Sequence, residues 1–310
     1  MSRQLSWAAA LTVAALVSLP PATFAKDKEP APGEICSQIT NAIGLPQDPG
    51  DEAAPTTTVC HLGYLIGHND HRKAPNWVAE RLTPTLIKKK AKRGSKGFDP
   101  DPALPETARA TDDDYKGNRP FDRGHNAPAA DFAFNKKFLD DTFFFSNVVP
   151  QVGAGFNRSI WRSLETQVRN LIGNNHPVLY VITGSVWQRA KPIKIDNDIC
   201  GTEMTLPVIK PVAICPATAG GHTSAKCPAG VSVPAAMFKI VYDPGMGNAF
   251  AVLMQNQSHS GRYRRTRDYI EAHRVGIATI ERLTGLRFFS ALPKRKQRQM
   301  RGACVDVRVH

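Results

Sequence analysis

Four residues recur every four positions in the middle of the chain, and a histidine lies upstream of them. They are Asn157, Trp161, Glu165 and Arg169. On an α-helix this spacing places all four on one stripe that drifts by about 40° per step. Amide and carboxylate oxygens can hold a hard cation, a guanidinium can bind phosphate oxygens, and the imidazole of His125 can deprotonate a water molecule. This combination is typical of a site that hydrolyses a phosphodiester.

Three motifs follow one another in this region. They are Asp122-Arg123-Gly124-His125, Ser146-Asn147-Val148-Val149-Pro150-Gln151, and a run from Asn157 through Trp161 to Glu165. Together they resemble the signature of the DNA/RNA non-specific endonuclease family, the ββα-metal nucleases that include mitochondrial endonuclease G. The resemblance covers roughly residues 64–293. It implies an α+β fold, in which a central, mainly antiparallel sheet is flanked by helices and carries a ββα-metal (His-Me finger) active-site element.

The resemblance implies a metal-dependent endonuclease that hydrolyses phosphodiester bonds of DNA and RNA with little base preference and leaves 5′-phosphate products. Low base preference also follows physically, because contacts to the phosphate backbone carry no sequence information. The expected cofactor is Mg²⁺, with Mn²⁺ as the alternative ion. Two rival interpretations stay open: a secreted nucleic-acid-binding protein of the same fold without turnover, and a phosphodiesterase that acts on a different kind of substrate.

His125 is the candidate general base, because an unperturbed imidazole has a pKa of about 6.5 and is mostly neutral at neutral pH. Gly124 is expected to bend the backbone so that this ring faces a cleft. Asn157 is the candidate metal ligand, since Mg²⁺ keeps several waters; a helix N-cap is the competing role. Glu165 is expected to orient the waters of the metal, and a surface pair with Arg169 is its ordinary alternative.

Other residues of the motifs receive supporting roles. Arg123 and Arg169 are expected to bind phosphate or to shape the site through carboxylate pairs. Asn147 is expected to position the loop of His125 or a metal-bound water. Asp122 fits a structural hydrogen-bond acceptor in the turn better than a catalyst. Trp161 fits the core, as buried aromatic residues usually do.

A basic run at residues 88–97 precedes Phe98 and supplies further cationic candidates. In the resembled family an Arg usually stands before an aromatic residue here and contacts the substrate phosphate. This chain has Lys96 two residues before Phe98, with Arg93 just upstream, so either one could bind substrate. The departure matters because Lys presents a point charge where Arg presents a planar fork. A solvated loop is the alternative for the whole run.

The chain has 310 residues, 42% of them apolar, and its 40 basic and 27 acidic side chains give a formal charge of +13. This composition indicates a globular protein. The charge favours polyanionic partners, here DNA and RNA, because phosphate neutralisation releases counterions. Solubility or membrane-surface contact is the alternative reason for such a balance. The sequence does not fix the oligomeric state, and a homodimer stays open.

Residues 1–25 have a short basic start, an apolar run and small residues before position 26, which is typical of a removable secretory signal. A retained anchor is the alternative. We therefore predict export to the periplasm or the extracellular space. Six cysteines, an even number, agree with an oxidising compartment and three disulfides. The sequence does not fix the pairing; the arrangement that we favour is Cys36–Cys60, Cys215–Cys227 and Cys200–Cys304.

The predicted organisation is a signal at residues 1–25, an N-terminal extension at 26–59, a nuclease-like domain at 60–293 and a basic tail at 294–310. Residue patterns predict strands at 60–66, 76–82, 121–125, 178–186, 237–242 and 249–255. Helical spacing predicts helices at about 157–172 and at 267–283, the second stopped by a Thr-Gly pair. Three phenylalanines at 143–145 are expected in the core, and residues 200–234 in a disulfide-stapled surface insertion.

Overall fold

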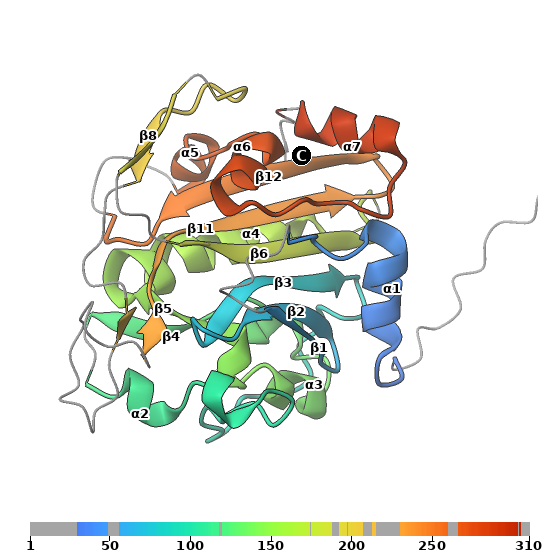
Figure 1. The fold of residues 1–310 in the computed structure, drawn as a ribbon. Coiled ribbons are helices and arrows are strands. Elements are labelled where there is room, and N and C mark those ends of the chain that lie inside the picture. The colour runs from blue at the N-terminus through green and yellow to red at the C-terminus, as the bar shows by residue number, and fades with distance from the viewer. Residues whose placement is uncertain are drawn as a thin grey trace, which may run out of the picture.

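A six-stranded antiparallel sheet forms the centre of the molecule, with the strand order β1-β2-β3-β6-β11-β12 (Figure 1). The computed structural model describes residues 30–48, 56–117, 120–173, 175–187, 192–196, 198–206, 213–214, 230–259, 266–302 and 304. The strands are β1 (Thr56–Cys60), β2 (Tyr64–Asn69), β3 (Ala74–Leu82), β6 (Leu179–Trp187), β11 (Pro234–Asp243) and β12 (Asn248–Gln255). This α+β architecture is the predicted one.

Helices cover both faces of the sheet and create two cores. One face packs against α1 (Glu34–Ile43), α6 (Ile277–Thr284) and α7 (Lys294–Arg301), and the other against α4 (Arg162–Leu171). On β11, Phe238 and Ile240 belong to the first core. Met237 and Val241, on the same strand, belong to the second. This alternation is the period of two that a strand imposes. The second core therefore packs the sheet against α4.

Shorter elements surround this frame. A two-stranded antiparallel sheet of β4 (Phe121–His125) and β5 (Val148–Val152) lies on the α4 side. Strand β5 leads into η4 (Gly153–Trp161), a segment that continues into α4. The remaining elements are η1 (Glu106–Ala108), α2 (Asp112–Tyr115), η2 (Ala129–Asp131), α3 (Lys136–Asp141), η3 (Phe145–Asn147), β7 (Ile193–Ile195), β8 (Met204–Leu206), β9 (Ala213–Ile214), β10 (Val231–Ser232) and α5 (Thr266–Glu271).

The helix predicted at residues 267–283 is wrong, because the structure divides it into α5 and α6. Between them the chain runs along the edge of β12: the Leu253 amide donates to the His273 carbonyl at 2.9 Å, and the Val275 amide donates to the Ala251 carbonyl at 3.0 Å. Backbone hydrogen bonds to the edge strand β12 therefore interrupt the helix that the residue spacing predicted. The predicted stop is confirmed, since Gly285 ends α6 with a left-handed φ of 81°.

The start of the chain contributes more to the fold than its composition indicates. Helix α1 lies inside the predicted extension, and its buried Ile35, Ile39 and Ile43 belong to the first core. Strand β1, at the end of the same stretch, is an edge of the central sheet. The strand predicted at 60–66 is in fact the end of β1, a turn, and the beginning of β2.

Two disulfides join the described residues, Cys36–Cys60 and Cys200–Cys304, and both are predicted pairs. Cys215 and Cys227, like the signal at residues 1–25 and most of the predicted insertion, lie outside the described residues. None of the described helices combines the length and the apolar character needed to cross a bilayer.

Candidate active site

Strands β4 and β5, followed by η4 and α4, bring the three sequence motifs into one ββα unit. The strands pair antiparallel, with His125 opposite Val148 and Asp122 opposite Gln151. Because β5 leads straight into η4, the first motif on β4 and the last motif on the helix lie on neighbouring elements. The unit rests on the second core, where the fully buried Trp161 packs as predicted.

Two glycines of this unit are required by close packing. A Cβ on Gly124 would stand 2.2 Å from Cδ of Gln151, so Gly124 gives room to the Gln151 side chain. This corrects the expectation that Gly124 bends the chain. Gly155 has a φ of +78°, and a Cβ there would stand 2.3 Å from the Ser258 hydroxyl. Ala154 and Gly155 have non-helical φ/ψ, so the helix begins after them, which agrees with the predicted start near residue 157. Its first turns, up to Trp161, are π-helical, and the α-helix α4 begins at Arg162.

The imidazole of His125 lies against an aromatic wall. Its ring centroid is 5.2 Å from that of Phe98 and 5.0 Å from that of Phe143. Burial, together with the positive charge of Arg93, lowers the pKa of His125 to about 4. Nε2 is buried and has no hydrogen-bond partner in the described part of the chain. The ring is therefore neutral over the whole physiological range. Phe143, predicted only as core, contacts the candidate base.

The structure separates the two cationic candidates of the basic run. The exposed guanidinium of Arg93 lies 4.5 Å from the Phe143 ring centroid and 5.7 Å from that of Phe98. Lys96 instead forms an ion pair with Asp99. Arg93 is thus the cation beside His125, and Lys96 has a carboxylate partner of its own.

Arg123 joins the same aromatic group from β4. Its guanidinium carbon lies 5.9 Å from the Phe98 ring centroid and 5.7 Å from that of Tyr115. It also forms an ion pair with Asp112, whose side chain is exposed. Phe98 therefore has His125, Arg93 and Arg123 around one ring. Its position just after the basic run was the only sequence signal for this role.

Asn157 is tied to the strand that carries His125. Its Nδ2 donates to Asp122 at 2.9 Å, and the Arg158 Nε donates to the same carboxylate at 2.7 Å. These two bonds, with the Arg158 charge, hold the pKa of Asp122 below its usual range although burial acts to raise it. Asp122 is thus the structural acceptor that was predicted. A carboxylate can only accept, so the Asn157 amide must present nitrogen to Asp122 and keeps Oδ1 as its remaining acceptor.

Asn147 closes the loop that follows His125. Its Nδ2 donates to the carbonyls of Ala127 and Thr142, both at 3.0 Å, and its Oδ1 accepts from the Ala127 amide at 2.9 Å. The Asn126 amide donates to the Asn147 carbonyl at 2.9 Å. Asn147 is fully buried. These hydrogen bonds fit the first of its two predicted roles, positioning of the His125 loop.

A cluster of buried charges lies between α4 and the sheet. Burial raises the pKa of Glu165 to about 7, while the charge of Lys239 opposes the rise and that of Asp131 adds to it. Arg169 forms an ion pair with Asp131, so the alternative Glu165–Arg169 surface pair is wrong. Glu80 and Lys239 are each only 1% exposed. Sequence analysis missed both, because isolated charges within strand patterns give no local signal.

The residues fit a hard cation held mainly by water. No three His, Cys, Asp or Glu side chains gather as a metal-binding group in the described ranges. An asparagine oxygen is also a possible metal ligand. Asn157 offers its Oδ1, because its Nδ2 donates to Asp122. Glu165 adds a carboxylate on the same helical stretch. Mg²⁺ typically binds through one or two protein oxygens together with water and substrate phosphate, which is what this donor set can supply.

Comparisons with known proteins identify a family and several similar nucleases. The sequence profile of DNA/RNA non-specific endonucleases matches residues 49–295. The mitochondrial nuclease of Saccharomyces cerevisiae is 31% identical over 253 residues, which cover 79% of this chain and 68% of that protein. Nuclease C1 of Cunninghamella echinulata is 30% identical over 248 residues, which cover 78% and 86%. A crystal structure of an EndoG/EndoGI complex matches with a TM-score of 0.65 and 26% identity over 87% of this chain and 96% of the other.

Proposed function

Because this chain belongs to the DNA/RNA non-specific endonuclease family, whose members are divalent-metal-dependent nucleases, we propose that it is an exported enzyme that cuts DNA and RNA with His125 as general base. The observation that supports this assignment is the enclosed imidazole, whose pKa is lowered to about 4. A ring that is neutral at physiological pH can accept a proton from the attacking water. We assign Nδ1 as the acceptor, since Nε2 is buried.

Asn157 and Glu165 form the metal-binding side of the proposed site. Asn157 would hold Mg²⁺, or alternatively Mn²⁺, through Oδ1, and Glu165 would accept hydrogen bonds from the waters around the ion. The bound ion supplies charge stabilisation to the phosphate oxygens. Asp122 positions the Asn157 amide, and the buried Lys239 and Arg169 favour the ionised form of Glu165.

Phosphate binding is assigned to Arg93 and Arg123. Arg93 is exposed beside His125, and the ion-pair partner of Arg123 in the described part of the chain is the exposed Asp112, so either guanidinium can turn to a phosphate at modest cost. Arg169 is assigned to structure, because its partner Asp131 is buried. Contacts of this kind to phosphate do not depend on base or sugar.

Plasmid and RNA cleavage assays test the assignment. The wild type is expected to nick and then degrade both substrates with Mg²⁺ and to stop in EDTA. His125→Ala is expected to lose about 10²–10⁴-fold in rate, the usual contribution of a general base, while it keeps salt-sensitive DNA binding. Native-rate cleavage by this variant would refute the base assignment. Binding without cleavage by the wild type would favour the rival, a binding protein of the same fold.

Export is proposed from the signal-like residues 1–25 and from the two disulfides. Several relatives are named as mitochondrial nucleases, so an organellar leader is the competing role for the same residues. Fractionation of cells that express the full chain, with N-terminal sequencing of the product, separates the two. Periplasmic or extracellular protein that begins near residue 26 is expected; an uncleaved cytoplasmic product would contradict export.

A further inference from the structure

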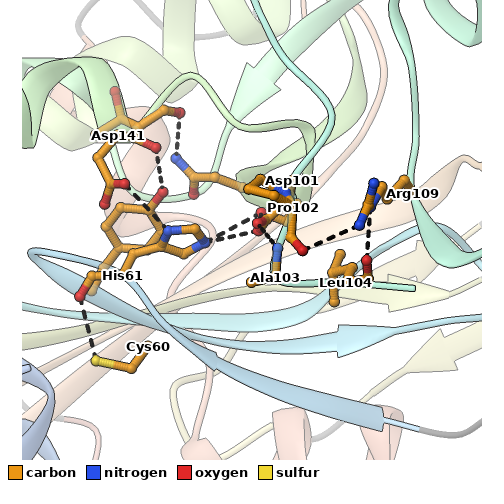
Figure 2. Close-up of polar contacts among 12 residues, drawn as sticks. Cys60, His61, Asp101, Pro102, Ala103, Leu104, Arg109 and Asp141 are labelled. Carbon is orange, nitrogen blue, oxygen red and sulfur yellow. Dashed lines mark hydrogen bonds and ion pairs between the residues drawn. The ribbon is translucent and has the colours of Figure 1, made fainter. Parts of the chain in front are cut away.

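A second imidazole, that of His61, lies in a buried polar cluster outside the proposed catalytic residues (Figure 2). It stands in the turn between β1 and β2. The ring is stacked between Tyr64 and Phe144, with centroid distances of 4.8 Å and 5.3 Å. Its Nε2 is 2.9 Å from an oxygen of Asp101, and its Nδ1 is 3.4 Å from an oxygen of Asp141. Both edges of the ring therefore face carboxylates.

This environment favours the protonated ring. Burial by itself would favour the neutral form, but the hydrogen bonds and charges of Asp101 and Asp141 outweigh it and raise the pKa of His61 to about 9. Tyr64, the third titratable group against the ring, has its own pKa raised by burial and by the same two carboxylates. At neutral pH the cluster thus holds one buried cation between two anions.

Hydrogen bonds connect His61 to the second sequence motif. Asp101 accepts from the hydroxyl of Ser146, as well as from the Ala103 amide at 2.9 Å. Ser146 immediately precedes Asn147, the buried amide that closes the loop after His125. On the other side, Asp141 accepts from the Leu62 amide at 2.9 Å, which joins the end of α3 to the β1–β2 turn.

The same cluster holds together the two segments that form the wall of His125. The Asp99 amide donates to the Phe143 carbonyl at 3.0 Å, and the Phe145 amide donates to the Asp99 carbonyl at 2.9 Å. Phe98 begins one of these paired segments and Phe143 begins the other. Asp101 and Ser146, at their far ends, meet at His61.

We propose that His61 is a positioning residue for His125: it fixes the segments that carry Phe98 and Phe143 and, through Asp101 and Ser146, the Asn147 loop. His61 touches neither the proposed base nor any proposed phosphate or metal ligand. Its effect on His125 runs through the aromatic wall that packs against that imidazole. The catalytic consequence of this proposal rests on the proposed function, whereas its effect on the His125 environment does not.

The test is an NMR titration of His125 in the full chain without metal, in the wild type and in His61→Gln. In the wild type the His125 pKa is expected near 4. In His61→Gln the wall loosens, more of the ring is exposed to water, and the pKa is expected to rise toward the unperturbed value of about 6.5. For cleavage of a short oligonucleotide, kcat is expected to fall about 10- to 100-fold, as for a misplaced catalytic group, with KM changed much less.

His68→Gln is the matched control. His68 is also fully buried, and it also pairs with a carboxylate, that of Asp70 at 3.1 Å. It lies at the other end of β2, away from the segments that hold Phe98 and Phe143. Its loss should lower stability without moving the pKa of His125 or kcat. Equal shifts in both variants would mean that general loosening, and not positioning, explains the effect.

Two further measurements keep the proposal testable if His61→Gln does not fold. Ser146→Ala removes only the link from Asp101 to the motif, and it should move the His125 pKa in the same direction. In the wild type, the His125 ring-current shift should change as pH rises through about 9, where His61 loses its proton. An unchanged His125 signal in both experiments would overturn the proposal. Absence of cleavage by the wild type would refute the proposed function and leave this test intact.

Discussion

Enclosure of one imidazole determines the expected chemistry at the scale of single residues. Free imidazole is half protonated at about pH 6.5. In His125, burial against Phe98 and Phe143 and the positive charge of Arg93 both disfavour the protonated ring. Its neighbours therefore keep it in the form that accepts a proton. The histidine itself was predictable from its motif. Its phenylalanine wall was not, because the two rings come from segments that are about 45 residues apart and meet only in the folded chain.

The pH dependence of kcat/KM should reflect this enclosure. A base must be unprotonated, so activity is lost as pH falls through the folded pKa, and the acid limb that His125 causes is expected near pH 4. Glu165, whose pKa is about 7 without metal, is expected to stay ionised at saturating Mg²⁺, because a nearby cation favours the carboxylate. The measurement is initial-rate cleavage of a short oligonucleotide at saturating Mg²⁺, with folding checked by circular dichroism at each pH. A limb at the ordinary histidine value, about 6.5, would show that water reaches the ring in solution.

Arg93 and Lys96 should differ sharply when each is replaced by Gln. Arg93→Gln removes an exposed guanidinium beside His125, so cleavage is expected to fall by about 10- to 100-fold, the usual range for a lost charged hydrogen bond. Lys96→Gln breaks only a pair with the half-exposed Asp99, so its rate should stay within about twofold. Steady-state rates at fixed ionic strength decide between them, and the opposite ranking would assign the phosphate contact to Lys96.

At the scale of elements, packing against a distant loop determines where the helix that carries Asn157 begins. Gly155 takes a left-handed conformation and touches the loop at Ser258, and two residues later the chain presents Asn157. The helix was predictable from its four-residue row, and its start was correct. The tight turn before it was not predictable, because the contact that requires it comes from a loop about 100 residues downstream. The interruption between α5 and α6 was missed for the same reason, since β12 imposes it.

Two glycine substitutions separate backbone strain from packing. Gly33 and Gly155 have nearly the same left-handed φ, +79° and +78°. An added Cβ at Gly155 would meet neighbouring atoms, whereas one at Gly33 would meet none of the described residues. Gly33→Ala and Gly155→Ala should each lose about 1–2 kcal/mol of unfolding free energy from the left-handed conformation. Gly155→Ala should lose more and should also lower kcat, because the shift reaches Asn157. Denaturant melts and kinetics measure both effects; equal losses would mean that the loop simply moves aside.

On the scale of the whole molecule, a sheet with two covered faces separates stability from catalysis. The ββα unit lies on the α4 face, while α1, α6 and α7 cover the other. The strands in the centre were predictable because their residues are β-branched and apolar. The contribution of α1 and β1 was not, since the Pro- and Thr-rich segment around them has the composition of a loop.

The two disulfides should therefore have different functional effects. Replacing both Cys200 and Cys304 by Ser opens a loop of 104 residues and is expected to cost about 2–5 kcal/mol of unfolding free energy, with kcat at 25 °C unchanged. Replacing Cys36 and Cys60 opens a shorter loop of 24 residues but frees the turn that holds His61, so kcat should fall. Thermal melts and single-turnover rates test this, and loss of activity in the first variant alone would contradict it.

The main-chain contacts that residues 273–275 make with β12 have a consequence for self-association. An open edge strand invites another chain to add itself in register, which is a route to dimers and to fibrils. Here the protein occupies that edge with its own backbone. The contacts cover the middle of β12, at Ala251–Leu253, and leave only short stretches at its two ends. The other edge strand of the described sheet, β1, is five residues long and rich in threonine. Copies of this enzyme that meet in solution should therefore join through side chains, without sharing a continuous sheet across β12.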